Sequence, residues 1–158
     1  MKLNLTLEQV KEIAASGEYD IIPVSAQMYS DSTTPTEVVR ILKRVSRHVF
    51  LLESAEADKR WGRYSFIGYD PVLELNCTDG EVKLTTPMTK QDYKGNPREV
   101  VRQVLRENRS PRLEELPPFT GGLVGYFSYD YIKYSEHSLK LDAEDEEGFQ
   151  DVDLMLFH

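Results

Sequence analysis

The 158-residue sequence has very little cysteine, and this scarcity limits how its fold can be held together. A single cysteine, Cys77, can form no disulfide within the chain and cannot build a cysteine-rich metal site. A chain of this length buries about 70% of the surface that its unfolded form exposes, so it needs no covalent cross-link. We therefore expect a single domain in a reduced, cytoplasmic setting.

Long apolar runs and an excess of basic residues are missing as well. No stretch approaches the roughly 18 apolar residues of a membrane helix, and the N-terminal MKLNLTLEQV lacks the apolar centre of a signal peptide. Lys and Arg number 19 against 27 Asp and Glu, which leaves a net charge of −8. Such a chain repels phosphate backbones and anionic lipid headgroups. Neither a nucleic acid nor a membrane is therefore an expected partner.

Residues that commonly carry catalysis are also scarce. The three histidines, His48, His137 and His158, do not form the HExxH spacing that places two ligands on one metal ion. No GxSxG motif surrounds a serine, and the run GGLVG has neither the GxGxxG pattern nor the lysine of a Walker loop. We expect no catalytic residue and no metal site in this chain.

Helix and strand signals, in contrast, are plentiful. Capping residues followed by apolar residues at helical spacing predict helices that begin after Thr6, Thr34 and Asn96. β-prone segments predict strands over 19–29, 48–52, 64–69, 72–77, 81–86, 119–134 and 152–157, with Asp-Gly making a hairpin turn between two of them. The pattern indicates an α/β (α+β) fold, with antiparallel sheet layers and packed helices.

The apolar run VDLMLF stands at the end of the sequence. An apolar strand with an unpaired edge invites aggregation. We therefore expect this sequence to be the front part of a longer protein.

The segment from His48 to Pro71 is the strongest candidate for a binding site. Two β-prone stretches flank a polar loop that brings an acid, a hydroxyl and several bases to one edge of a sheet. The carboxylate of Glu53 can pair with an ammonium group, and the guanidinium of Arg63 can bind a carboxylate through two hydrogen bonds. With Ser54, this combination suits an amino-acid zwitterion. Two alternatives are that Ser54 caps a turn and that the acids of the loop form salt bridges with its bases.

Two motifs of the chain, LLESAEADKRWGRYSFIGYDP and PFTGGLVGYFSYD, resemble the N-terminal region of anthranilate synthase component I. That family is the chorismate-using subunit of the first committed step of tryptophan biosynthesis, and the likeness covers nearly the whole chain. Aminodeoxychorismate synthase component I, of the folate pathway, shares the glycine-rich motif and remains an alternative. The LLES and RWGRYSFIG blocks resemble the anthranilate enzyme more closely.

The resemblance implies a regulatory role for residues 1–158. In this family the LLES motif contributes to the allosteric site for the end product L-tryptophan, which assigns Leu52, Glu53 and Ser54 to the effector pocket. A basic residue at the start of the following strand also belongs to that site and aligns with Arg63. The chain would then be the N-terminal regulatory domain, one part of the family's α/β fold with its two-layer β-sandwich core.

The resemblance also implies what this chain lacks. The family's chorismate and Mg²⁺ site, which converts chorismate and glutamine or ammonia to anthranilate and pyruvate, belongs to a C-terminal portion not contained in this sequence. The chain is therefore expected to be inactive alone. A glutamine amidotransferase subunit is the expected partner of the complete enzyme, and an alternative is that this segment mainly supplies an interaction surface for that subunit.

Overall fold

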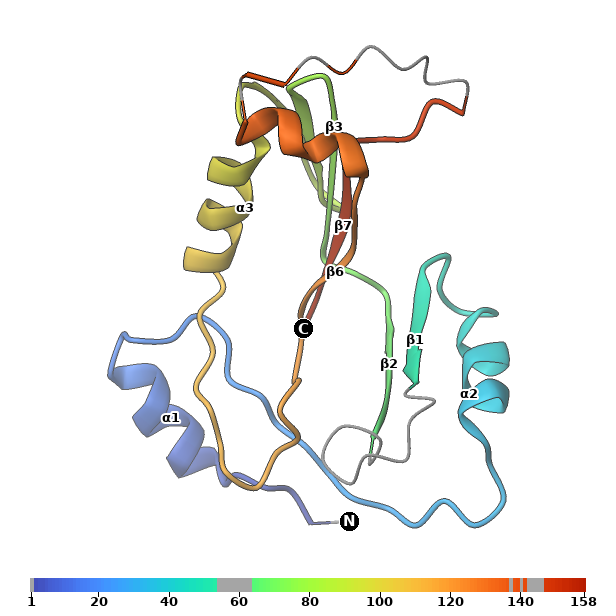
Figure 1. Ribbon diagram of the computed structural model, residues 1–158. Coiled ribbons are helices and arrows are strands. Elements are labelled where there is room, and N and C mark those ends of the chain that lie inside the picture. Colours follow the sequence, from blue (N-terminus) through green and yellow to red (C-terminus); the bar gives the residue numbers. More distant parts are fainter. Residues whose placement is uncertain (1, 54–63, 137, 140, 142–146) are drawn as a thin grey trace. The chain divides into compact units, whose positions relative to one another are not determined.

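The computed structural model describes residues 2–53, 64–136, 138–139, 141 and 147–158. The chain divides into two compact units. The first unit comprises Met1–Pro71, Asn108–Gly121 and His158, and the second comprises Val72–Glu107 and Gly122–Phe157. The described residues form helices and two antiparallel sheets, one in each unit (Figure 1). The predicted α+β class with antiparallel sheets is confirmed.

Each predicted helix begins where the sequence places a cap. The helices are α1 (Leu7–Ala15), α2 (Pro35–Leu42) and α3 (Pro97–Arg106). Thr6 accepts a hydrogen bond from the backbone N–H of Gln9, and the Gln9 side chain accepts one from Thr6 in return. Thr34 and Asn96 cap the other two, each followed by a proline in the first turn. None of the described helices is long and apolar enough to cross a membrane.

The sheet of the first unit has two strands, β1 (Val49–Glu53) and β2 (Ser65–Tyr69), which confirms the predicted strand pair. α2 packs against both strands. Phe50 pairs across the ladder with Gly68, and its ring occupies the place that a side chain at Gly68 would take. The ring of Phe119 packs edge-on against Phe66, with 5.4 Å between the centroids. These aromatic contacts hold the pair together from one face.

The strand predicted over residues 19–29 is wrong. Within that segment a single residue, Ala26, forms one antiparallel bridge, to Leu3. Pro23 in the middle of the segment has no N–H to donate to a ladder, which limits pairing there. The segment joins neither of the two sheets that the described residues form.

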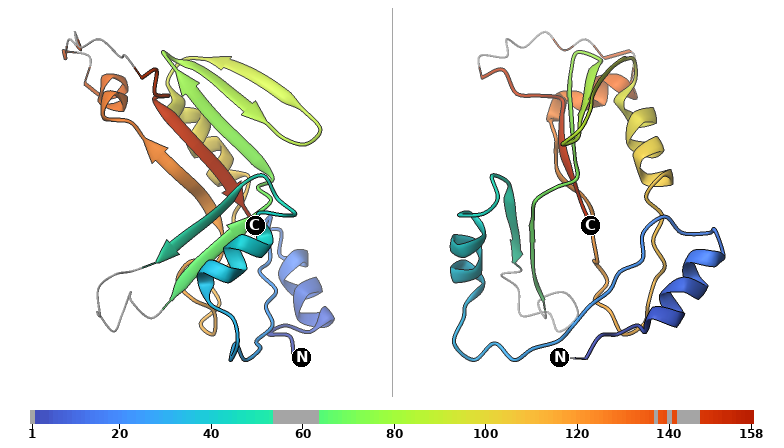
Figure 2. Two further views of the ribbon diagram at one scale, coloured as in Figure 1. Left: turned by 90° about the vertical axis from the view of Figure 1, so that its right-hand side faces the viewer. Right: turned by 180° about the vertical axis from the view of Figure 1, so that it is seen from behind.

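The second unit contains a sheet of five antiparallel strands in the order β5-β4-β3-β7-β6 (Figure 2). Its strands are β3 (Leu73–Thr78), β4 (Glu81–Thr85), β5 (Lys90–Lys94), β6 (Gly122–Phe127) and β7 (Val152–Phe157). The predicted hairpin between β3 and β4 is confirmed, and both turn residues, Asp79 and Gly80, have the positive φ of such turns. β5 was not predicted, because its residues KQDYK are polar and largely exposed at the sheet edge.

The strand VDLMLF lies inside this sheet, with a neighbouring strand on each side. β7 pairs with β3 on one side and with β6 on the other. Gly125 makes the second pairing possible, because a Cβ at that position would collide with the backbone oxygen of Asp153. The glycine-rich run thus lets the backbone of β7 come close at Gly125.

The core of the second unit lies between its sheet and α3, which covers one face (Figure 1). Its buried members are Leu75, Cys77, Val82, Val104, Val152, Leu154 and Leu156. The strand predicted over 119–134 is too long, because β6 ends at Phe127 and a 3₁₀ helix, η1 (Tyr129–Tyr134), follows. The backbone N–H of Tyr131 donates a hydrogen bond to the carbonyl of Ser128, and this turn ends the strand.

Candidate functional site

The two described residues of the predicted effector site lie at the end of β1. Leu52 pairs across the ladder with Phe66, and Glu53 pairs with Ser65. Because side chains alternate between the two faces of a strand, Leu52 shares a face with Phe66 and Glu53 shares the opposite face with Ser65. A ligand that lies on one face alone therefore meets one of the two side chains and not both.

Glu53 is the polar end of this strand pair. Its exposed carboxylate accepts a 3.0 Å hydrogen bond from the Ser65 hydroxyl. Among the described residues this bond leaves most of the acceptor capacity of the carboxylate unused, because a carboxylate has about four lone-pair positions. The geometry is therefore suited to an ammonium group. Ser54 and Arg63, the other two predicted effector residues, lie outside the described residues, and the effector assignment stays a prediction.

The second unit carries a pocket that the sequence did not predict. Its volume of about 640 Å³ lies within the range of roughly 300–1,000 Å³ that is typical of small-molecule sites. The β3–β4 turn, the end of β6, η1 and the segment before β7 supply its lining. Aromatic side chains form part of the wall, since Tyr126 and Phe149 meet edge to face with 6.5 Å between their centroids and Tyr129 stands beside them in the lining.

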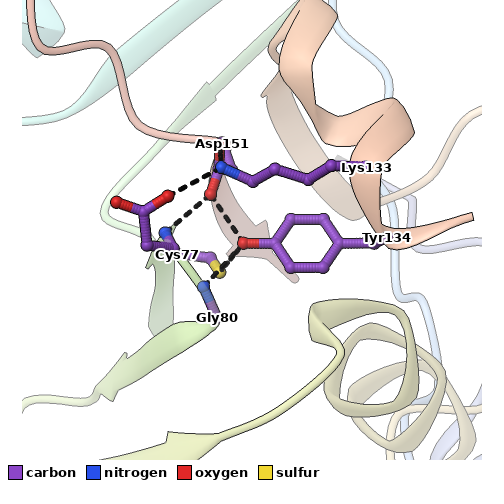
Figure 3. Close-up of polar contacts among 6 residues, drawn as sticks. Cys77, Gly80, Lys133, Tyr134 and Asp151 are labelled. Carbon is purple, nitrogen blue, oxygen red and sulfur yellow. Dashed lines mark hydrogen bonds and ion pairs between the residues drawn. The ribbon is translucent and has the colours of Figure 1, made fainter. Parts of the chain in front are cut away.

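Asp151 organises the polar wall of this pocket. The residue is 4% exposed, and its carboxylate lies 2.8 Å from the Lys133 ammonium. The Tyr134 hydroxyl donates to it at 2.6 Å, and the backbone N–H of Asp79 donates at 2.8 Å. Figure 3 shows Lys133 and Tyr134 reaching from η1 to this carboxylate. Asp151 thus ties η1 to the β3–β4 turn.

Lys133 is held between two carboxylates. Its ammonium lies 2.8 Å from Asp79 as well as 2.8 Å from Asp151. Tyr134 accepts a hydrogen bond from the backbone N–H of Gly80 at 2.6 Å, which anchors the turn again. Because the ammonium of Lys133 is already paired with two carboxylates of the protein, it is a poor binding group for an external anion.

The pKa values of this cluster follow from burial and these bonds. Burial raises the pKa of Asp151, but hydrogen bonds from Lys133, Tyr134 and the Asp79 backbone outweigh it, and the net pKa is lowered. Burial lowers the pKa of Lys133, but its bonds to the two aspartates leave it raised. Burial and the bond to Asp151 raise the pKa of Tyr134. The cluster is therefore an aspartate, an ammonium and a neutral phenol at neutral pH.

Two further polar groups line the pocket. The Ser128 hydroxyl is buried and has no hydrogen-bond partner among the described residues. A buried group without a partner costs about 1–3 kcal/mol. The carboxylate of Asp130, half-buried on η1, also forms no ion pair or hydrogen bond within the part of the chain that the structure describes. In that part no group of three or more His, Cys, Asp or Glu is arranged to hold a metal ion.

Comparisons with known proteins bear on both units. No protein-family model matches the chain. Anthranilate synthase component 1 of Acetivibrio thermocellus is 35% identical over 151 residues, which are 95% of this chain and 30% of that protein. The proteins of the same name from Aquifex aeolicus and Acinetobacter calcoaceticus are 37% and 34% identical, over 86% and 96% of this chain. By sequence, the chain belongs to the anthranilate synthase component 1 family.

The match to the anthranilate synthase component 1 family extends over both units, since it covers 95% of the chain. The chain spans about 30% of the length of the curated relatives it matches, with 27% for the Aquifex protein and 31% for the Acinetobacter protein. The strand pair with Glu53 and the pocket around Asp151 are thus both parts of one family segment. The resemblance first indicated by the LLES and glycine-rich motifs is confirmed.

Proposed function

We propose that this chain is the regulatory part of an anthranilate synthase component 1 and contributes its L-tryptophan effector site. The single observation that supports this is the relation to several anthranilate synthase component 1 proteins at 34–37% identity across most of the chain. That relation supports the role in tryptophan biosynthesis, and the LLES motif supports the proposed feedback inhibition by the end product.

The proposed effector contacts begin at Glu53. Its exposed carboxylate, held by the Ser65 hydroxyl at 3.0 Å, pairs with the ammonium group of tryptophan. Leu52 lies on the other face of β1, so it contacts the ligand only where the ligand reaches around the strand end. Ser54 and Arg63 complete the proposed set, with Arg63 binding the ligand carboxylate.

In the complete protein, the proposed reaction converts chorismate and glutamine or ammonia to anthranilate and pyruvate. The chorismate and Mg²⁺ site lies in the portion of the family protein that this chain does not span. Component II, the glutamine amidotransferase, is the proposed partner. Tryptophan inhibits by binding more tightly to the arrangement in which the distant chorismate site is closed, because a ligand shifts an equilibrium only through differential affinity.

The test is tryptophan inhibition of the natural-length protein that carries this chain. Glu53→Gln removes one charge-assisted hydrogen bond, worth about 1.5–3 kcal/mol, and raises the half-inhibitory tryptophan concentration roughly tenfold or more. Ser54→Leu has an effect of at least that size. Glu12→Gln on the exposed face of α1 is the matched control and leaves inhibition unchanged.

Unaltered inhibition in a folded, active Glu53→Gln or Ser54→Leu protein would show that the effector assignment is wrong. Analysis of the product in the same assay tests the reaction itself. Release of anthranilate and pyruvate supports the assignment. Formation of aminodeoxychorismate would instead show that the chain is part of the folate-pathway enzyme.

A further inference from the structure

We propose that the pocket of the second unit binds a small organic cation, an amine that carries an apolar body. The proposal rests on a cavity of about 640 Å³ whose lining combines carboxylates, aromatic rings and a buried hydroxyl that has no partner among the described residues. It is independent of the effector site on β1. Neither the family relation nor the proposed regulation assigns a ligand to this pocket.

The charge of the lining determines whether the pocket favours a cationic or an anionic ligand. Asp79 and Asp151 both contact Lys133 at 2.8 Å, so these three residues sum to a formal charge of −1. Asp130 adds a carboxylate that has no ion-pair or hydrogen-bond partner among the described residues, so the described residues of the lining carry a formal charge of −2. A low-dielectric wall strengthens the attraction of this charge for a cation. An anionic ligand finds no unused base in the described lining.

The aromatic wall favours a cationic group attached to an apolar body. Tyr126 and Phe149 pack edge to face, and Tyr129 is 86% exposed although it is a large aromatic residue. The faces of aromatic rings carry partial negative charge and attract ammonium groups, while the rings themselves cover apolar surface. A ligand with both features removes this exposed apolar surface from water.

The buried hydroxyl of Ser128 supplies an independent indication. A buried polar group without a partner among the described residues calls for a physical reason, and a role in binding a ligand is one such reason. Ser128 belongs to the lining of the same pocket and precedes η1, which carries Asp130 and Lys133. A small shift of this residue on binding would let the hydroxyl accept a hydrogen bond from the ligand's ammonium group.

Phenethylamine is the probe for this site, because it joins one ammonium group to one aromatic ring. Its binding to the natural-length protein is measured by isothermal titration calorimetry beside phenylacetate, which has the same ring and the opposite charge, and 2-phenylethanol, which is neutral. The proposal predicts binding of the amine, at least tenfold weaker binding of the alcohol and no binding of phenylacetate. Absence of amine binding at millimolar concentration, or equal binding of the alcohol, overturns it.

Variants assign the binding to this pocket. Asp130→Asn weakens amine binding roughly tenfold, which corresponds to about 1.4 kcal/mol. Tyr126→Leu weakens it a few-fold through loss of one ring, and Tyr129→Ser, at an exposed position, does so without risk to folding. Asp92→Asn, an exposed aspartate on β5 outside the pocket, is the matched control and has no effect.

Phenethylamine could also occupy the effector site, and one further variant separates the two. Glu53→Gln leaves amine binding unchanged if the pocket of the second unit is the site. Loss of amine binding in Glu53→Gln, with normal binding in Asp130→Asn and Tyr129→Ser, would overturn the proposal. Tryptophan inhibition, measured in the same proteins, reports separately on the effector site.

Discussion

The two units of the chain differ in how their sheets are supported. The sheet of the second unit has five strands, a helix over one face and a continuous core that includes fully buried Leu75, Val82 and Val152. The sheet of the first unit has two strands, and neither α1 nor α2 contains a fully buried residue. An isolated pair of strands is marginally stable in water. The second unit is therefore expected to carry most of the stability.

Both units leave large apolar side chains on their surfaces, but among the described residues the first unit buries one hydrophobic residue, Leu5, and the second buries eight. Ile41 and Val45 on and after α2, Leu52 on β1 and Tyr69 on β2 are each about half exposed or more. Segments with few buried contacts open at lower free energy than a closed core does. The predicted effector strand therefore belongs to the unit with few buried apolar residues, and the pocket around Asp151 belongs to the unit with the larger core.

The largest expected effect is the difference in stability lost when an apolar side chain is shortened in each of the two units. Leu75→Ala in the centre of β3 removes a side chain with 0% exposure and destabilises the protein by about 2–5 kcal/mol. Leu52→Ala, at 47% exposure on β1, costs less than about 1 kcal/mol. Urea unfolding of both variants measures the difference. Equal losses would show that the first unit is as tightly packed as the second.

A second prediction compares one glycine in each sheet. Gly125→Ala drives a Cβ into the backbone oxygen of Asp153 in β7, at a φ of +155°, and costs about 3 kcal/mol because the backbone cannot move aside. Gly68→Ala meets the ring of Phe50, a side chain that can rotate away. Thermal unfolding should show the smaller decrease for Gly68→Ala. The reverse order would contradict the rigid pairing of β6 with β7.

A third prediction concerns the polar cluster of the second unit. Asp151→Asn loses the ion pair with Lys133 and lowers the free energy of unfolding at pH 7 by about 1.5–3 kcal/mol. The pKa of Asp151 is lowered in the folded state, so its contribution is present above the unfolded pKa of about 3.9 and is lost as pH falls through the folded pKa. Urea unfolding between neutral and acid pH checks this.

The control for that experiment is Asp92→Asn on the exposed face of β5. It should leave stability nearly unchanged at every pH. If Asp151→Asn keeps the wild-type difference between neutral and acid pH, the cluster does not stabilise the second unit.

The smallest effect is expected for the ion pair of the first unit. Asp20 accepts a side-chain and a backbone hydrogen bond from Arg109, both at 3.0 Å, and these bonds lower the pKa of Asp20. The pair is solvent-exposed, so Arg109→Gln should hardly change the melting temperature. An NMR titration should nevertheless show the pKa of Asp20 moving back toward its ordinary value. A large fall in the melting temperature would show that this exposed ion pair contributes strongly to the stability of the first unit, against the prediction.

Local signals in the sequence predicted the helices and most of the strands. Thr34 with Pro35 defines a helix start within two residues, and Asp79-Gly80 defines a hairpin, because cap and turn chemistry depends on neighbours in the chain. β5 escaped prediction because an edge strand has no apolar face to mark it. Residues 19–29 carried β-prone side chains, but pairing depends on a partner strand, and the segment finds only one bridge.

The two candidate sites also differ in whether local sequence reveals them. Glu53 was singled out from its own motif, a local feature, and the structure adds that it lies on the opposite face of β1 from Leu52. The pocket around Asp151 could not be found in this way. Lys133 and Asp79, which form an ion pair, are 54 residues apart, and Asp79 and Asp151 are 72 residues apart. Only the fold brings them together.

The place of β7 between β3 and β6 has a consequence for the synthesis of the protein. β3, β4 and β5 are consecutive in the chain and can pair as soon as they leave the ribosome, but the other neighbour of β3 comes late, since Asn76 and its hydrogen-bond partner Asp153 are 77 residues apart. Pairings between distant residues form slowly. Until residues 152–157 are synthesised, β3 has an unpaired edge, and a nascent chain that stalls before them leaves this edge open to aggregation.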